Sequence, residues 1–364
     1  MGAAEEDAVG VLILEPGFAI LNPNGRDQTK IFAQGAGSPS EDGHAPVNYH
    51  GYAACCRGGF FRKVEEVPNA VGGVLILLRR NGIRAAMNAV HELRKRGKQV
   101  RISWKESGLW QVGHALANSG LRRKFHALCS AADGFISSTP DLVPLYEAAG
   151  CGKGRFVPTP YPIEEPAWDF SVPISQRNGI FIGTREFGVP SRNHFLAVAC
   201  ISALGQPVTV INTEGWAGAR FLRSISPHLR IVPGTLPYAD YLRLMAQHRV
   251  VFQLDRSGVP GQVAGDSLLC GVPCLGGDGA IDRLVFPKLC AASLSAEAAV
   301  KMVKRLLVDD DLYRETIENA RELALKRVSF SHVKTELFAE FGLSPGGGLI
   351  GGEPPLRSAR QKPG

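Results

Sequence analysis

The chain alternates short apolar segments with segments of helical spacing, and it does so in two successive blocks along its 364 residues. Residues 82–97 of the first block end with basic residues and a glycine, as helices commonly do. The alternation restarts at residue 179 and continues through apolar runs such as residues 208–213 and 249–254. Strands that alternate with helices form parallel sheets covered by helices on both faces. We therefore predict an α/β protein with two Rossmann-like, doubly wound parallel-sheet domains.

A proline-rich stretch separates the two blocks. Residues 158–179 contain five prolines, a composition that is typical of a connection between domains. We predict a first domain over residues 1–160, a linker over 161–178, a second domain with terminal helices over 179–342 and a flexible tail over 343–364. Residues 33–59 are rich in glycine, serine and proline and show no period, so we predict a long loop there.

Charge and cysteine content exclude several classes of protein. The net charge is +7, and residues 1–160 hold 19 Lys and Arg against 14 Asp and Glu, which suits an anionic ligand. No long basic run is interleaved with aromatic residues, as a nucleic-acid surface would require. No apolar run reaches the ~18 residues of a membrane helix, and the acidic start does not resemble a secretory signal, so we predict a cytoplasmic protein. The cysteines show no zinc-ligand spacing, and we predict no metal site.

Polar residues and glycines follow the predicted strands of both blocks. In parallel sheets ligands bind outside the carboxyl ends of the strands, so these residues are expected to line a cleft. They are Gly17 after residues 8–15, Lys105 and Glu106 after 98–104, Arg185 and Arg192 after 179–184, and Asp255 and Arg256 after 249–254. The alternative is a surface salt bridge between the neighbours Lys105 and Glu106, with the two arginines of the second block as loop charges on the surface.

The stretch from residue 254 to 277 carries more turn chemistry than a plain strand–helix–strand connection requires. Gly258 and Gly261 let a phosphate approach the backbone, and the helix predicted to begin near Gln262 offers unpaired N–H groups to an anion. Asp266 lies within that helix, where its carboxylate could accept hydrogen bonds from a ribose. The alternative for Asp266 is a solvated position on the helix.

The segment GQVAGDSLLCGVPCLGG resembles the donor-site motif of retaining GT-B glycosyltransferases of the family 4-like, group 1 type. That motif is a Glu, seven residues, then a second Glu followed by Ala-Met-Ala-x-Gly-x-Pro. Asp266 takes the second Glu position, Gly271 and Pro273 match the tail, and Gly258 stands where the family has its first Glu. Segments 138–162 and 231–254 also resemble the family, so the likeness covers roughly residues 98–330. It implies the GT-B fold, in which the two domains face each other across a cleft.

The resemblance implies a hexosyltransferase that moves a sugar from a UDP- or GDP-sugar to an acceptor hydroxyl, with retention and without a metal or other cofactor. The first domain would then be the acceptor side. The implied catalytic residues are Glu106, Lys105, Arg185 and Arg192, the two arginines occupying the place of the family's diphosphate-binding pair. The implied donor-binding residues are Gly17, Arg185, Arg192, Asp255, Arg256, Gly258, Gly261, Gln262 and Asp266.

Several alternatives stay open at this point. The acceptor could be a glycan, a lipid, a natural product or a modified nucleic acid. Gly258 in place of a Glu also suits a non-catalytic GT-B-like nucleotide-sugar-binding protein, and a sugar-nucleotide epimerase shares the fold. The acidic run from Val308 to Tyr313 is predicted to begin a helix rather than to hold a metal. If Glu106 is not catalytic, His44 and His50 are the next candidates.

Overall fold

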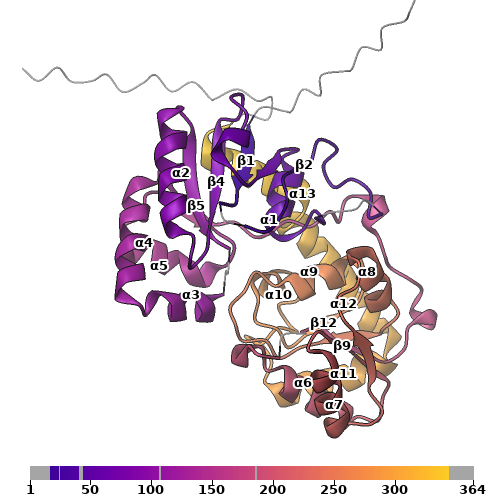
Figure 1. The fold of residues 1–364 in the computed structure, drawn as a ribbon. Helices are drawn as coiled ribbons and strands as arrows, with labels where there is room; N and C mark the ends of the chain where they lie inside the picture. The colour runs from indigo at the N-terminus through magenta and orange to yellow at the C-terminus, as the bar shows by residue number, and fades with distance from the viewer. Residues whose placement is uncertain (1–16, 24, 41–43, 106–107, 185–186, 344–364) are drawn as a thin grey trace, which may run out of the picture.

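The chain folds around two separate β-sheets. The computed structural model describes residues 17–23, 25–40, 44–105, 108–184 and 187–343. Figure 1 shows the sheets in two lobes, with strands β1, β4 and β5 in one and β9 and β12 in the other. Each sheet is composed mainly of parallel strands, which confirms the predicted α/β fold class.

The first sheet has seven strands in the order β2-β3-β1-β4-β5-β6-β7. All neighbouring pairs are parallel except β2 and β3, which are antiparallel. The central strand β4 is a fully buried apolar run, as expected where helices cover both faces of a sheet, and β5 beside it is buried after its first residue. The strands are β1 Phe18–Leu21, β2 Lys30–Ile31, β3 Gly59–Phe61, β4 Gly73–Leu78, β5 Gln99–Trp104, β6 Gly134–Ser137 and β7 Gly154–Phe156.

The second sheet has five parallel strands in the order β10-β9-β8-β11-β12. The chain leaves β8 towards β9 on one side and reaches β11 on the other, so the strand order reverses between β8 and β11. Such a reversal opens a crevice at the carboxyl ends of the two strands. The strands are β8 Ile180–Ile182, β9 Val208–Asn212, β10 Arg230–Pro233, β11 Val250–Phe252 and β12 Cys274–Leu275.

Helices cover both faces of the first sheet and surround the second (Figure 1). In the first half they are α1 Asn48–Cys55, α2 Ile83–Lys95, α3 Leu109–Leu116, α4 Ser119–Ala131 and α5 Val143–Ala148. In the second half they are α6 His194–Ser202, α7 Gly215–Ile225, α8 Tyr238–Ala246, α9 Gln262–Leu269, α10 Ala280–Val285, α11 Ala296–Val308, α12 Asp310–Arg327 and α13 Phe330–Phe341. Single 3₁₀ turns form at η1 Val64–Glu66, η2 Pro140–Leu142, η3 Pro166–Trp168, η4 Ile174–Gln176 and η5 Pro190–Arg192. Helix α2 confirms the helix predicted over residues 82–97.

Two local predictions need correction. The predicted loop over residues 33–59 contains helix α1, whose buried face packs on β1 and on α13. The small residues that suggested a loop let this helix pack closely: a Cβ at Gly51 would lie 2.9 Å from the carbonyl oxygen of Pro160. Helix α7 follows β9 in a segment for which the sequence predicted no helix. Its apolar residues are divided between a buried and an exposed side, so they do not form a single apolar stripe in the sequence.

The C-terminal helix α13 packs against the first sheet. Phe341 and Phe18 of β1 make an edge-to-face ring contact at 5.4 Å, and Arg101 Nη2 of β5 lies 3.3 Å from Glu340 Oε2. The division at residues 160 and 179 stays a prediction, and this contact ties the end of the predicted second domain to the first. Among the described residues, no helix is long and apolar enough to cross a membrane.

Candidate functional site

A cavity of about 670 Å³ lies between the two lobes. Asn48, Tyr49, Lys105 and Gln111 line it from the first half of the chain. Its second wall comes from the carboxyl ends of β8 and β11, from the start of α9 and from the loop before α10. This is the crevice that the strand order of the second sheet predicts, so the cavity lies where an α/β protein binds its ligand.

The start of α9 forms the floor of the cavity. Gly261, Gln262 and Val263 all line it, and α9 has no side-chain cap, so N–H groups of its first turn are available to an anion. Gly261 has a φ of 92°, in the left-handed region, and an added Cβ would lie 2.9 Å from Asp282 Oδ2. Only glycine fits this turn without strain, which explains the glycine of the sequence pattern.

Gln262 joins the two lobes across the cavity. Its side-chain oxygen accepts a hydrogen bond from Asn48 Nδ2 of α1 at 2.8 Å, and its backbone oxygen accepts one from the Tyr161 hydroxyl at 3.2 Å. These contacts position the start of α9 against the first lobe. A ligand at the helix start therefore lies within reach of residues from both halves of the chain.

Asp266 lies one turn into α9 and lines the same cavity. It is 1% exposed, which rules out the alternative of a solvated helix position. Its Oδ1 accepts a hydrogen bond from the Tyr238 hydroxyl at 2.6 Å. A buried carboxylate held in this way is a preorganised acceptor for ligand hydroxyl groups.

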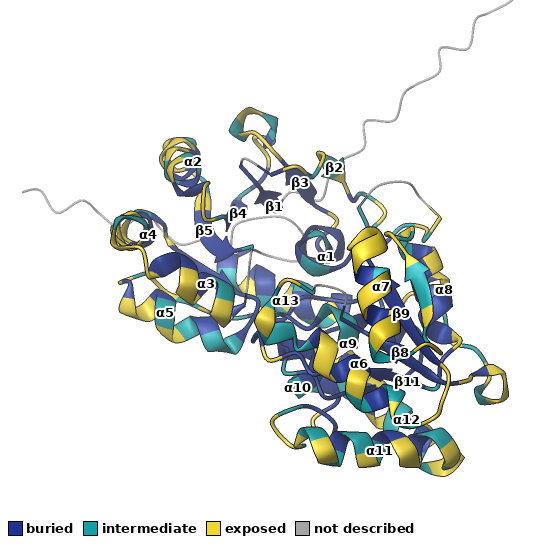
Figure 2. Ribbon diagram, turned by 60° about the horizontal axis from the view of Figure 1, so that its bottom comes forward, coloured by how far each residue is buried: buried dark blue, intermediate teal, exposed yellow. Residues whose placement is uncertain are grey.

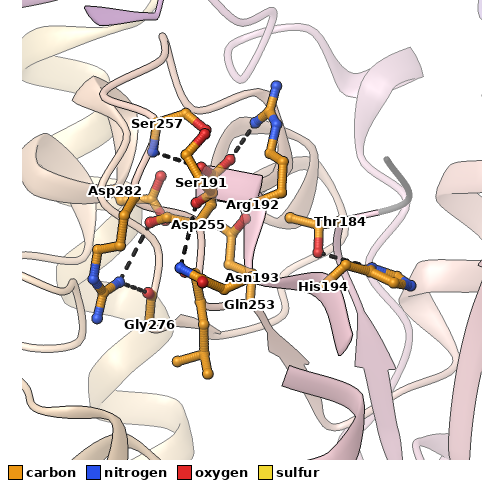
Figure 3. Close-up of polar contacts among 12 residues, drawn as sticks. Thr184, Ser191, Arg192, Asn193, His194, Gln253, Asp255, Ser257, Gly276 and Asp282 are labelled. Carbon is orange, nitrogen blue, oxygen red and sulfur yellow. Dashed lines mark hydrogen bonds and ion pairs between the residues drawn. The ribbon is translucent and has the colours of Figure 1, made fainter. Parts of the chain in front are cut away.

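Arg192 and Asp255 form an ion pair just beyond the carboxyl end of β11 (Figure 3). Asp255 Oδ1 also accepts a hydrogen bond from Ser257 N at 2.8 Å, and both members of the ion pair line the cavity. Asn193 Nδ2 donates to the Leu254 carbonyl at 2.9 Å, which fixes the loop that carries Arg192 over the end of β11. Arg192 is thus a cavity cation and not one of the surface loop charges that the alternative describes.

Asp282 and Gln253 form a second polar pair in the cavity, labelled in Figure 3. Gln253 Nε2 donates to Asp282 Oδ1 at 2.9 Å, whereas Asp282 Oδ2 has no hydrogen-bond partner among the described residues. Burial of Asp282 is nearly complete, and this burial, together with the charge of nearby Asp255, raises the pKa of its carboxyl to about 7. Asp282 therefore exchanges a proton near neutral pH, and its protonated form donates a hydrogen bond.

Lys105 brings positive charge to the cavity from the first sheet. It follows β5, as predicted, and its ammonium group forms an ion pair with Asp27 and lies 5.9 Å from the centre of the Phe60 ring. The pKa of Asp27 is lowered: its burial, which acts to raise it, is outweighed by the hydrogen bond and charge of Lys105. Lys105 thus lines the cavity as a cation, whereas Glu106 lies outside the described residues.

His44 and His50, the next candidates of the sequence, stack on each other beside this ion pair. Their ring centres are 4.3 Å apart, and His50 also stacks on Phe60 at 4.2 Å. Burial lowers the pKa of His44 and lowers that of His50 to about 3, so both imidazoles are neutral at pH 7. Neither lines the cavity, although α1 carries His50 one residue after the cavity residue Tyr49.

Three predicted donor-binding residues are not among those that line the cavity. Gly17 directly precedes β1 at the amino end of the sheet, where an added Cβ would lie 3.6 Å from Leu343 Cδ1. The strand predicted over residues 8–15 lies outside the described residues. Arg256 Nη1 donates to the Gly276 carbonyl at 2.6 Å, which turns its side chain away from the cavity. Gly258 faces Asp141 and Leu109 of the first lobe. Arg185 lies outside the described residues.

The residue patterns missed several cavity residues, and some carried a usable signal. Thr184 follows β8, so the strand-end argument applied to that strand would have found it. After β12 the same argument points first to Asp278, whereas Asp282 lies in helix α10. Gln253 follows β11 directly. Asn48, Tyr49 and Gln111 carried no such signal, because they reach the cavity only through the packing of the two lobes.

No group of three or more His, Cys, Asp or Glu side chains that could hold a metal occurs within the described ranges. The acidic run at residues 308–313 starts helix α12, as predicted. Asp309 is its cap, accepting a hydrogen bond from Leu312 N at 2.9 Å, and Asp310 pairs with Arg249 at 2.7 Å.

Comparisons with known proteins reveal solved structures of similar fold. No family model matches the chain, and no curated protein matches it. The structure of HepE (Alr3699) from Anabaena in complex with UDP has a TM-score of 0.63 and 11% identity and covers 89% of this chain and 99% of its own. A trehalose-6-phosphate synthase studied for glycosyl transfer with retention has a TM-score of 0.53 and 12% identity, and the alignment covers 74% of this chain and 73% of the synthase chain. A trehalose-6-phosphate structure from E. coli bound with UDP-2-fluoro glucose has a TM-score of 0.52, 14% identity and coverages of 74% and 72%.

These identities are low, and the likeness therefore rests on the arrangement of the elements. The alignments nevertheless extend over most of this chain and of each matched chain. The resemblance found in the sequence predicted this arrangement. The chain has the GT-B fold of the nucleotide-sugar glycosyltransferases.

Proposed function

We propose that this protein is a hexosyltransferase that moves a sugar from a UDP- or GDP-sugar to an acceptor hydroxyl, with retention and without a metal or other cofactor. The observation that carries the proposal is the cavity at the reversal of strand order, which the uncapped start of α9 lines together with Arg192 and Asp266. A helix start and a guanidinium together suit a diphosphate. HepE, which shares the fold, has been observed with UDP, which favours a uridine nucleotide.

In this proposal the donor diphosphate lies at Gly261, where the first-turn N–H groups of α9 and Arg192 stabilise the negative charge of the departing nucleotide. Such preorganised donors are most effective when the charge develops in a site shielded from water. The Asp266 carboxylate accepts hydrogen bonds from the ribose hydroxyls. This division of roles uses the side chains that the cavity brings together and requires no metal to neutralise the diphosphate.

The acid that recognises the donor sugar comes from a different segment than the resemblance suggests. Gly258, at the family's first Glu position, is not a cavity residue and has a φ of 59°, which favours glycine over a side chain. Asp282 reaches the cavity from the first turn of α10, and Gln253 reaches it from the end of β11. We assign sugar-hydroxyl recognition to this pair.

The acceptor side belongs to the first domain, proposed over residues 1–160. Lys105 lines the cavity there, and Glu106, the next residue, is assigned the reaction itself as a general base or as a stabilising charge. The linker over residues 161–178 is assigned the hinge for closure of the two domains, with the second domain over 179–342. A closed form would bring the acceptor hydroxyl to the donor sugar.

Nucleotide binding without metal tests the proposal directly. We expect UDP or GDP, in the presence of a chelator, to stabilise the protein by roughly 2.7 kcal/mol at a hundredfold excess over the dissociation constant. Arg192→Ala should remove this shift, and Arg256→Ala is the matched control because its side chain does not line the cavity. A shift that requires magnesium or manganese, or one that Arg256→Ala abolishes equally, would contradict the proposed site.

A non-catalytic nucleotide-sugar-binding protein is the second candidate, favoured by the absence of an acid at Gly258. Incubation with UDP-glucose separates the candidates. Release of UDP by hydrolysis or by transfer to added acceptors supports the transferase, and tight binding with an intact donor supports the binding protein. Conversion of the donor sugar without any acceptor would indicate an epimerase of the same fold.

A further inference from the structure

Helices α6 and α7 present large apolar side chains to solvent. Trp216 is 74% exposed, Leu196 53%, Phe221 47% and Phe195 37%. The rings of Phe195 and Phe221 lie 4.4 Å apart, so the two helices form one continuous surface. Figure 2 shows both helices with exposed sides. We call these four residues the α6–α7 surface.

The fold does not need these side chains. On α6 the residues Ala197, Val198 and Ile201 are buried against the sheet, and on α7 Gly218 and Leu222 are buried. The α6–α7 surface is therefore additional to the core. Large apolar residues that cluster on the outside of a folded protein mark a binding surface.

The charges beside the α6–α7 surface are mostly positive. Arg220 lies over the Trp216 ring at 5.0 Å, and Arg223 is exposed on the same helix. Between residues 194 and 232 the sequence holds three arginines, the third being Arg230, against a single acid, Glu214. A helix with tryptophan and phenylalanine next to arginine is typical of a segment that lies in the interface of an anionic membrane.

We propose that the α6–α7 surface binds the protein peripherally to a bilayer that contains anionic lipid. The aromatic side chains would enter the headgroup region, and Arg220 and Arg223 would pair with lipid phosphates or carboxylates. A second copy of the chain fits less well, because a two-fold contact centred on α7 would bring the same arginines face to face.

The α6–α7 surface also lies close to the cavity. The ring centres of Phe195 and Phe187 are 5.3 Å apart, and those of Phe187 and His194 are 4.2 Å apart. His194 Nδ1 in turn lies 3.1 Å from the hydroxyl of Thr184, which lines the cavity. Binding through this surface would place the cavity next to the membrane. The proposal does not require catalysis, since membrane binding is measured independently of any sugar transfer.

Co-sedimentation of the full chain with vesicles tests the proposal. The parent protein should bind vesicles of phosphatidylcholine and phosphatidylserine, bind pure phosphatidylcholine more weakly and dissociate at high salt. Arg220→Glu with Arg223→Glu should lower the partition coefficient on the anionic vesicles by about 30-fold or more. Arg314→Glu on α12 is the matched charge control and should retain binding.

A second pair of variants tests the apolar contribution. Trp216→Ser with Phe221→Ser should lower binding by roughly 10-fold or more, whereas Val308→Ser with Leu325→Ser, also exposed apolar positions, should not. Equal melting temperatures would show that all variants fold. The proposal is overturned if the parent does not bind anionic vesicles, or if the arginine variant and the aromatic variant of the α6–α7 surface both bind as tightly as the parent. It is also overturned if light scattering shows a dimer that Trp216→Ser with Phe221→Ser dissociates.

Discussion

Replacing Asp282 by asparagine should remove a large part of the pH dependence of folding. Asp282 is 1% exposed and is held by Gln253. Asparagine keeps an oxygen that can accept the Gln253 hydrogen bond, but it cannot titrate. The comparison of the two proteins therefore isolates the proton on this carboxyl.

The sign follows from the raised pKa of Asp282, about 7 in the folded protein against an ordinary value of 3.8. The folded protein holds this proton more tightly than the unfolded chain, so protonation contributes stability that is fully present below about pH 4 and is lost as the pH rises through about 7. Between about pH 5 and about pH 9 the free energy of unfolding falls by about 2.7 kcal/mol on account of this carboxyl, because pH 5 lies about two units below its folded-state pKa. Above that range the contribution of Asp282 no longer changes.

Equilibrium urea unfolding at about pH 5, 7 and 9 measures this contribution. Over this range the free energy of unfolding of the parent should fall by about 2.7 kcal/mol more than that of Asp282→Asn. Asp311→Asn is the matched control, because the Asp311 side chain is 94% exposed and its change should leave the pH dependence of the parent intact. If the parent and Asp282→Asn lose the same stability with rising pH, the carboxyl is already ionised at pH 5 and the assignment of a protonated Asp282 is refuted.

Three further predictions concern the cavity. Arg192→Ala leaves the buried Asp255 carboxylate without its guanidinium and should cost about 3–5 kcal/mol in urea unfolding; a variant as stable as the parent would show that solvent replaces the arginine. Asp266→Ala should weaken UDP binding by about 1.5–3 kcal/mol more than Asp310→Ala in calorimetry, and equal affinities would contradict the ribose assignment. Glu106→Gln should lower sugar turnover by ~10²-fold or more while UDP affinity stays the same, and turnover at the parent rate would exclude Glu106 as the base.

Local patterns were sufficient to predict most of the framework. The apolar runs that became β4 and β5 and the helical spacing that became α2 lie where the sequence indicates them, because the periods of strands and helices are properties of the local backbone. The strand-end argument also found Lys105, Arg192 and Asp255. Lys105 and Asp255 follow their strands within a few residues, so topology alone brings them to the edge of the sheet. Arg192 lies further from β8, in the 3₁₀ turn η5, and is held over the end of β11 by the contacts of its loop.

Nearby positions in the same loop show where this reasoning ends. Asp255 lines the cavity, but Arg256, the next residue, bonds to the Gly276 carbonyl, and Gly258 faces the first lobe. Successive residues in a loop point in different directions, and their backbone angles depend on what the loop packs against. The sequence pattern therefore located the loop at residues 254–261 but did not tell which of its side chains reach the cavity.

The remaining features depend on contacts between residues far apart in the chain. Asn48 meets Gln262 only because the two lobes pack together, and Asp282 acquires its raised pKa only because folding buries it beside Asp255. The amphipathic pattern of α7 is likewise ambiguous until packing decides which side of the helix meets the sheet and leaves Trp216 in solvent. Burial and charge–charge energies are set by distances through space, and a local pattern of residue types does not contain those distances.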